Sequence, residues 1–252
     1  MSSGPRGFVI FAMLALAVAI ATAWLAPAAL LDPRISGATG GTVRLAESDG
    51  TVWDGRGSLV AGATRIPIAW HVECAPLLRG VLRIRLASGT GAATPRATIE
   101  AGTGYVTFRQ VDVALPADVL GATLSPFAVA SVAGEISLKS DAIEWTPESS
   151  RGEARVVWRA ARIDFVGAPP LELGDVQTRV KADGSVLSGP VANDGGDLAL
   201  GGEWTIRLHD SVQLALHVAS RRPGPPELER MLSAIGTADG DGWRIDWRTP
   251  LR

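Results

Sequence analysis

The chain has 252 residues, of which 46% are hydrophobic and 20% are charged, so it can bury a hydrophobic core and is not disordered by composition. Its 24 basic and 26 acidic residues give a net charge of −2, which argues against a nucleic-acid-binding protein, since such proteins usually carry a basic excess. The single cysteine, Cys74, excludes an intrachain disulfide and any metal site in which this chain alone supplies several cysteine ligands.

The first element in chain order is an apolar run at residues 8–26, which contains no charged residue. It is close to the ~20 residues that a helix needs to cross a membrane, and it predicts a transmembrane signal-anchor. Arg6 precedes the run, so the positive-inside tendency places residues 1–7 in the cytoplasm. The alternative is a cleavable signal peptide, because Ala21-Thr22-Ala23 has the A-x-A form of a cleavage site. Both interpretations place the rest of the chain outside the cytoplasm.

The remaining sequence is dominated by rows in which every second residue is apolar, the period of a β-strand with one set of side chains on one sheet face. Such rows occupy residues 66–72, 82–86, 136–138, 156–158, 204–208, 212–218 and 243–247. Asp-Gly pairs, which supply the positive φ angles of tight hairpins, occur at residues 49–50, 183–184, 194–195 and 239–240. Short connections of this kind predict a curved antiparallel sheet rather than crossover helices.

Two segments have helical patterns. Residues 116–120 form one turn at most, whereas Pro226–Ile235 can begin at its proline and end before Gly236. The longer segment has one apolar stripe, at i, i+3, i+4 and i+7, made by Leu228, Met231, Leu232 and Ile235. We expect this stripe to pack on the sheet; a binding site for a partner helix is the alternative.

The sequence offers little catalytic chemistry. His71 and Glu73 share one strand face in an H-x-E pattern, but a zinc deaminase needs further cysteines that this chain lacks, so a solvated polar face is expected. His209 and His217 have no carboxylate cluster at ligand spacing, and Cys74 is expected on the apolar side as an inert thiol. The prediction is a protein without catalytic, cofactor-binding or metal-binding residues; only two close, buried carboxylates at a cleft would indicate a hydrolase.

The eight tryptophans are the more unusual feature of the composition. Tryptophans on strands are mostly core residues or cross-strand pairs, but a row of them can also line a groove for an apolar ligand such as a lipid. Seven are candidate structural or ligand-facing residues: Trp53, Trp70, Trp145, Trp158, Trp204, Trp243 and Trp247.

A series of short segments follows the apolar run in a characteristic order. They read GTVWDG at 50–55, IAW at 68–70, PLLRG at 76–80, LP at 115–116, GEISL at 134–138 and GGDLALGG at 195–202. Their order and spacing resemble those of protein N of the type II (general) secretion pathway, over residues 5–248. No single segment is specific, and the resemblance depends on the series.

The resemblance implies an accessory protein of the bacterial machine that exports folded proteins from the periplasm across the outer membrane. It implies a single-pass inner-membrane protein with residues 27–252 as a periplasmic β domain, partnered by other secretion subunits and without cofactors. A sub-boundary near residues 125–135 would divide that domain into two similar halves. The alternative function is a periplasmic lipid-handling protein, in which the tryptophan-bearing face of a curved sheet holds acyl chains.

Overall fold

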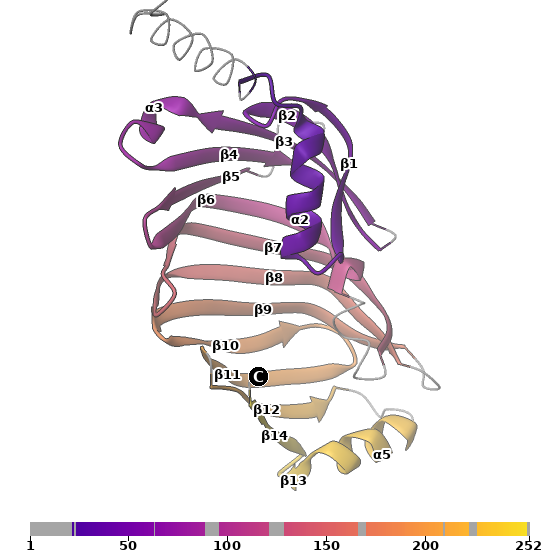
Figure 1. Cartoon of the computed structure of the whole chain (residues 1–252). Coiled ribbons are helices and arrows are strands. Elements are labelled where there is room, and N and C mark those ends of the chain that lie inside the picture. Colours follow the sequence, from indigo (N-terminus) through magenta and orange to yellow (C-terminus); the bar gives the residue numbers. More distant parts are fainter. Residues whose placement is uncertain are drawn as a thin grey trace, which may run out of the picture.

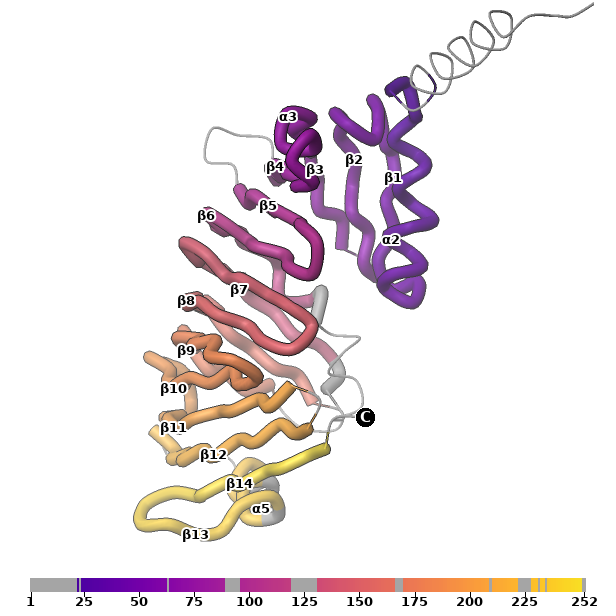
Figure 2. Tube along the Cα trace, turned by 60° about the vertical axis from the view of Figure 1, so that its left-hand side comes forward, coloured from indigo at the N-terminus to yellow at the C-terminus, as the bar shows by residue number. Residues whose placement is uncertain are grey.

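The computed structural model describes residues 22, 24–62, 64–88, 96–120, 129–165, 170–208, 210–221 and 226–250. These residues form one antiparallel sheet of 14 strands, in which each strand pairs with the next along the chain until the last two exchange places, β12-β14-β13. Figures 1 and 2 show the strands stacked from β1 at one end of the molecule to β13 and β14 at the other. The predicted mainly-β fold is confirmed.

The described helices are few and short compared with the strands. They are η1 (Ala28–Leu31), α2 (Asp32–Ala38), α3 (Cys74–Leu77), η2 (Ala117–Leu120) and α5 (Pro226–Ile235). The strands are β1 (Val43–Gly50), β2 (Asp54–Ala61), β3 (Thr64–Glu73), β4 (Leu82–Ser88), β5 (Arg96–Gly102), β6 (Tyr105–Pro116), β7 (Val129–Trp145), β8 (Ser150–Phe165), β9 (Leu171–Gly184), β10 (Val186–Asp194), β11 (Leu198–Arg207), β12 (Ser211–Ser220), β13 (Thr237–Asp239) and β14 (Gly242–Pro250).

The seven predicted rows correspond to β3, β4, β7, β8, β11, β12 and β14, although Leu208, the last residue of the row 204–208, lies in the turn after β11. The Asp-Gly pairs end β1, β9 and β10 or form the turn between β13 and β14. The other seven strands were not predicted, because small or interrupting residues weaken their alternation. Examples are Gly189 and Pro190 inside β10 and the alanines of β5.

The pairing register keeps apolar side chains on one side of the sheet across every strand. Trp70 pairs with Leu86, Phe108 with Ile143, and Trp204 with Leu214. We call this side the apolar face; its members include Leu45, Leu59, Trp70, Leu86, Ile99, Phe108, Leu138, Val156, Val176, Val191, Trp204, Leu214 and Trp247. The opposite side, the polar face, includes Arg65, His71, Arg85, Glu100, Arg109, Lys139, Arg155, Arg179, Glu203 and Asp246.

Bulges bend the sheet without exchanging its two faces. The register shifts in β1, in β6, twice in β7 and in the β8–β9 pair. Three of the bulged residues have positive φ although they are not glycine: Glu47, Gln110 and Ala160. The backbone N–H of Ala160 donates to Asp175 Oδ1 (2.9 Å), which holds the bulge of β8 against β9. An extra residue bends its strand and increases the local twist, so the long strands curve around the apolar face (Figure 1).

Two hydrophobic clusters lie at opposite ends of the apolar face. One gathers the side chains beneath η1 and α2 on β1–β4, centred on Ala28, Leu45, Trp70 and Val72. The other lies beneath α5, where Leu228 and Leu232 contact buried residues of β8, β9, β11 and β12. The prediction that α5 packs on the sheet is therefore confirmed for these two leucines. Ile235, the last residue of the predicted stripe, is 57% exposed and does not join the cluster.

Two other expectations need correction or remain open. Cys74 does not continue the apolar side of its strand; it begins α3 and is half-buried, with its Sγ 3.9 Å from the Val72 carbonyl. The sub-boundary near 125–135 stays a prediction, although the sheet continues through β6, β7 and β8 without a break in pairing order.

Most of the predicted anchor, residues 8–21 and 23, lies outside the described residues. Within the described part of the chain, no helix has the length and apolar character needed to span a membrane.

Candidate functional site

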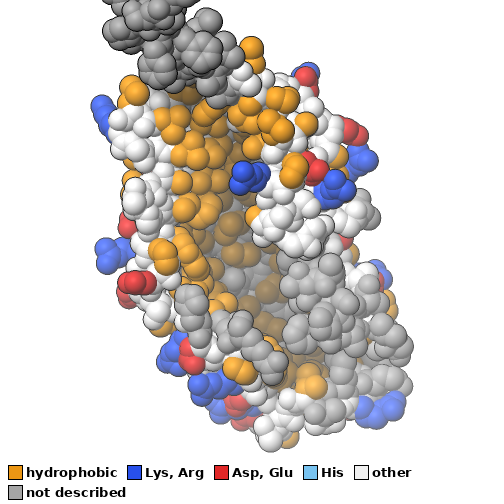
Figure 3. All heavy atoms as spheres, in the orientation of Figure 1, with side chains coloured by type: hydrophobic (Ala, Val, Ile, Leu, Met, Phe, Trp, Pro, Cys, Tyr) orange, Lys and Arg blue, Asp and Glu red, His pale blue; other side chains and the backbone are white. Residues whose placement is uncertain are grey.

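The centre of the apolar face differs from its two ends. On β5–β7 and the first part of β8, most apolar side chains are half-buried and belong to neither cluster, although Val111, Val132 and Ala154 are buried. From Trp158 onward, β8 contributes to the cluster beneath α5. Figure 3 shows hydrophobic side chains gathered over these strands in a hollow beside α2, continuous with those of β3 and β4. We call this region the central hollow; it includes Ile99, Val106, Phe108, Val113, Leu138, Ile143 and Val156.

Polar side chains on this part of the apolar face are already hydrogen-bonded within the protein. Ser140 Oγ donates to a backbone carbonyl of β8 (2.6 Å), and Ser150 Oγ donates to a backbone carbonyl of β9 (3.2 Å). Thr178 Oγ1 accepts from the indole N–H of Trp204 (2.8 Å). Because these groups are satisfied, the surface that remains is hydrocarbon.

The structure places all seven candidate tryptophans on the apolar face or in its clusters, spread from the β1–β2 corner to β14. It does not bring them into one row. Trp70 and Trp158 donate their indole N–H groups to backbone carbonyls at 3.2 and 2.9 Å, which fixes their rings in the sheet. Trp145 and Trp247 are the most exposed of the seven, at 37% and 40%. Their role as ligand-facing residues stays a prediction.

The N-terminal approach to the sheet is fixed beside the apolar face. Pro27 forms an isolated bridge with Thr51, and the Val52 N–H donates to the carbonyl of Ala26 (2.9 Å). The ring of Trp24 stacks on that of Trp53, with centroids 6.0 Å apart and an interplanar angle of 23°. The apolar run 8–26 therefore ends at the corner between β1 and β2, next to the cluster beneath η1.

On the polar face, ion pairs cross from strand to strand. Arg83 lies between Glu73 (3.2 Å) and Glu100 (2.8 Å), and Glu100 also accepts from Arg109 (3.1 Å). The hydrogen bond that Arg83 donates to Glu73 and the charge of Glu100 raise the pKa of Arg83 above its usual value. Opposite charges on neighbouring strands stabilise the register of β3–β6.

His71 belongs to this same solvated surface. It is exposed, and its Nδ1 lies 2.7 Å from Asp54 on β2. The expectation of a solvated polar strand face is confirmed for His71. Glu73 lies on the same face, but its side chain is only 18% exposed and is bound to Arg83 and Arg85.

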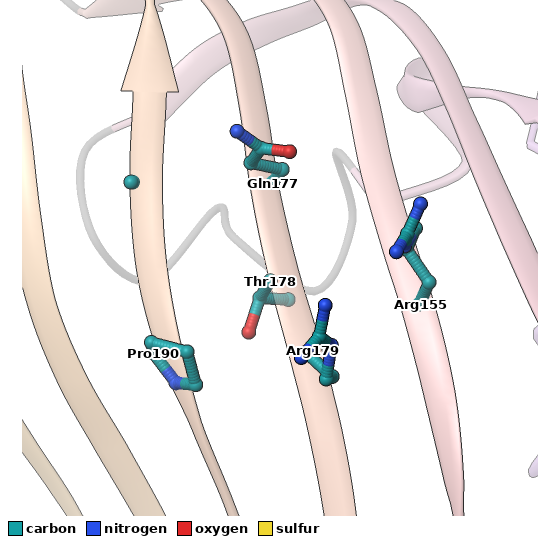
Figure 4. Close-up of a pocket in the computed structure, with 6 residues that line it drawn as sticks. Arg155, Gln177, Thr178, Arg179 and Pro190 are labelled. Atoms are coloured by element: carbon teal, nitrogen blue, oxygen red, sulfur yellow. The ribbon is translucent and has the colours of Figure 1, made fainter.

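A shallow polar pocket lies over β8, β9 and β10 (Figure 4). Arg155 and Arg179 line it and are direct cross-strand partners. The next cation in the same row, Lys139, is bound to Asp112 (3.0 Å), but neither arginine forms an ion pair with a described carboxylate. Like charges directly opposite each other on a sheet are destabilising, so this pair is an unusual feature of an otherwise paired surface.

The described residues hold no group of three His, Cys, Asp or Glu side chains that would bind a metal ion. Among the described carboxylates, those of Glu73 and Glu100 are largely buried, with side chains 18% and 14% exposed, but both bind Arg83 on the polar face. His209 lies outside the described residues.

Comparison with known proteins identifies the family. Neither a curated protein nor a solved structure matches the chain. The family model described as type II secretion system (T2SS), protein N, matches residues 41–245, which extend from just before β1 into β14 and so include nearly the whole sheet. The chain therefore belongs to the type II secretion system protein N family, a component of the machinery for protein secretion.

Proposed function

We propose that this chain is an accessory binding component of the type II secretion system, held in the inner membrane by residues 8–26 with its sheet in the periplasm. There it contacts other subunits during export of folded proteins across the outer membrane, and it works by binding rather than catalysis. The observation that carries the proposal is the family match over nearly the whole sheet. The uncharged run that ends at the β1–β2 corner supports the anchor.

For the contact with another subunit, the best-supported surface is the polar face at Arg155 and Arg179. Both side chains are exposed and lie on neighbouring strands, so their charges repel without a carboxylate between them. Acidic side chains of a partner would offset that repulsion and would accept paired N–H bonds from the guanidinium groups. Arginine is also enriched at protein–protein interfaces. The expected partner surface is therefore an acidic patch on another secretion subunit.

The test is a charge reversal of this pair, Arg155→Glu with Arg179→Glu, in the full-length chain expressed in cells that carry the other subunits. Crosslinking with mass spectrometry on the detergent-extracted protein should show crosslinks to secretion subunits, and the reversal should remove most of them. A control with the same change of charge is Arg65→Glu with Arg244→Glu, two exposed cations near opposite ends of the polar face. Crosslinks unaffected by the first pair would exclude this contact surface, and no secretion subunit crosslinked at all would overturn the assembly role.

The location of the sheet is tested with single cysteines, since Cys74 is the only native one. In a Cys74→Ser background, a cysteine replacing the exposed Arg207 should react with a membrane-impermeant maleimide in intact spheroplasts. A cysteine replacing Ser3 should react only after permeabilisation, and the chain should stay with the membrane after a carbonate wash. Protection of position 207, or release of the chain by carbonate, would contradict the anchored periplasmic arrangement.

A further inference from the structure

The central hollow is a wide apolar surface at the middle of the sheet. From β5 to β8 there are three interstrand spacings of ~4.8 Å, or ~14 Å across the strands. Through this distance the described side chains of the apolar face are apolar or carry polar atoms that are already bonded. Contiguous apolar surface of this extent on a protein usually marks a binding site.

We propose that the central hollow binds the acyl chains of a membrane phospholipid. An acyl chain needs no hydrogen bonds and gains from any apolar surface that removes it from water. An extended peptide on the same surface would bury backbone N–H and C=O groups for which the face has no free partners. The chemistry of the surface therefore favours hydrocarbon over a peptide strand.

The position and length of the hollow favour a lipid over an apolar helix of a partner. The chain that leaves the run 8–26 is fixed by Pro27 and Trp24 at the β1–β2 corner, so the apolar face begins where that run ends. If the run lies in the inner membrane, the premise on which this inference rests, then this end of the apolar face adjoins the bilayer surface. One leaflet of hydrocarbon is about 15 Å thick, half of the ~30 Å core, so the ~14 Å of apolar surface across β5–β8 is close to the depth that an acyl chain occupies in its leaflet.

The test uses a photoreactive benzoylphenylalanine, introduced one position at a time into the full chain reconstituted in vesicles of phosphatidylethanolamine and phosphatidylglycerol. Phe108 and Leu138 are the test positions in the central hollow. Arg109 and Lys139 are the matched controls, each the next residue along the same strand and on the polar face. Adducts are identified by mass spectrometry of the digested protein after irradiation.

The expected result is phospholipid attached at 108 and 138 in at least about tenfold excess over 109 and 139, because neighbouring residues of a strand point to opposite faces. Adducts to peptide at 108 and 138 would show that protein covers the hollow and would overturn the proposal. Equal lipid labelling on both faces, or none at the test positions, would overturn it as well.

A second measurement separates this inference from the secretion role. Leu138→Gln with Val156→Gln places two polar groups at the centre of the hollow, and Arg109→Gln with Lys139→Gln is the control change on the polar face. Circular dichroism and thermal melting first establish that both proteins fold. We expect the first pair to lower co-purified phospholipid at least about tenfold, since a buried amide without a partner is unfavourable. Unchanged lipid in a folded variant would overturn the inference. If the unaltered chain binds phospholipid at positions 108 and 138 but forms no crosslinks to secretion subunits, the proposed assembly role alone would be overturned.

Discussion

The ends and the centre of the sheet have the same pattern of side chains but different degrees of burial. At the two ends, Leu45 and Leu198 are only 5% and 3% exposed, because a helix lies over each. At the centre, residues of the same kind, such as Phe108 and Leu138, are half-buried and lie outside both clusters. Alternation alone therefore creates an apolar face, but a second layer is needed to turn that face into a core.

The two covered ends also differ in how their helices are held. α5 inserts Leu228 and Leu232 into its cluster. α2 is tied by its first residue, Asp32, whose carboxylate accepts from the Leu45 N–H (2.8 Å) and from Arg44 Nη2 (2.9 Å). One end is therefore closed mainly by hydrophobic burial, and the other combines burial with charge-assisted hydrogen bonds.

The largest expected effect is at the α5 end. Leu232→Ala should lower the free energy of unfolding by about 2–5 kcal/mol, because it removes a side chain that is 2% exposed and leaves a cavity. Ile235→Ala on the same helix should change it by no more than about 0.5 kcal/mol. Urea denaturation of the two variants measures the difference. Equal losses of stability in the two variants would contradict the conclusion that the buried leucines hold α5 on the sheet.

The bulge at Gly174, in the β8–β9 pair near α5, should be nearly as sensitive to substitution. Gly174 has φ +70°, and a Cβ there would lie 2.1 Å from the Asp194 carbonyl oxygen, so Gly174→Ala should destabilise by about 3 kcal/mol. Gly184 has φ +64° in open space, so Gly184→Ala should cost only about 1–2 kcal/mol of backbone strain. The comparison by denaturation isolates the close approach of the backbones. A smaller loss of stability for Gly174→Ala than for Gly184→Ala would exclude this close approach.

The centre should be more tolerant of truncation than the ends. Leu138→Ala should cost about 1 kcal/mol in the protein stripped of lipid, because part of that side chain already contacts solvent. Leu45→Ala at the α2 end should cost about 2–5 kcal/mol. Denaturation of both variants measures the contrast between centre and end. If Leu138→Ala lowered the free energy of unfolding as much as Leu45→Ala, the centre would be a closed core with no room for a ligand.

The smallest effect concerns the pH dependence of the α2 end. The hydrogen bonds from Arg44 and the Leu45 N–H lower the pKa of Asp32 below that of an ordinary aspartate. A lowered folded-state pKa means that this carboxylate contributes stability above the unfolded pKa and loses the contribution as the pH falls through the folded value. The melting temperature should therefore fall less steeply between about pH 6 and pH 2 for Asp32→Asn than for the unaltered chain. The difference should be small, because the pair is at the surface, and identical curves would remove Asp32 as a support of α2.

The sequence predicted the features that depend on local patterns. Period-two rows identified seven strands, Asp-Gly pairs identified hairpins, and Pro226 with Gly236 gave the bounds of α5, since a strand, a tight turn and a helix cap are each specified by a few neighbouring residues. The short helix α2 was missed because its sequence, DPRISGA, contains proline and glycine and has only one large apolar residue, Ile35.

Only the tertiary structure decided which of these elements meet. The bulges at Gln110 and Ala160 bring long strands into register with their apolar residues on one side, and nothing in an isolated strand indicates where the extra residue lies. With 24 basic and 26 acidic residues, the sequence could not show that Arg83 is paired while Arg155 and Arg179 face each other. Whether an apolar row becomes a core or an open hollow depends on which helix folds back over it, and that is settled by packing between segments far apart in the chain.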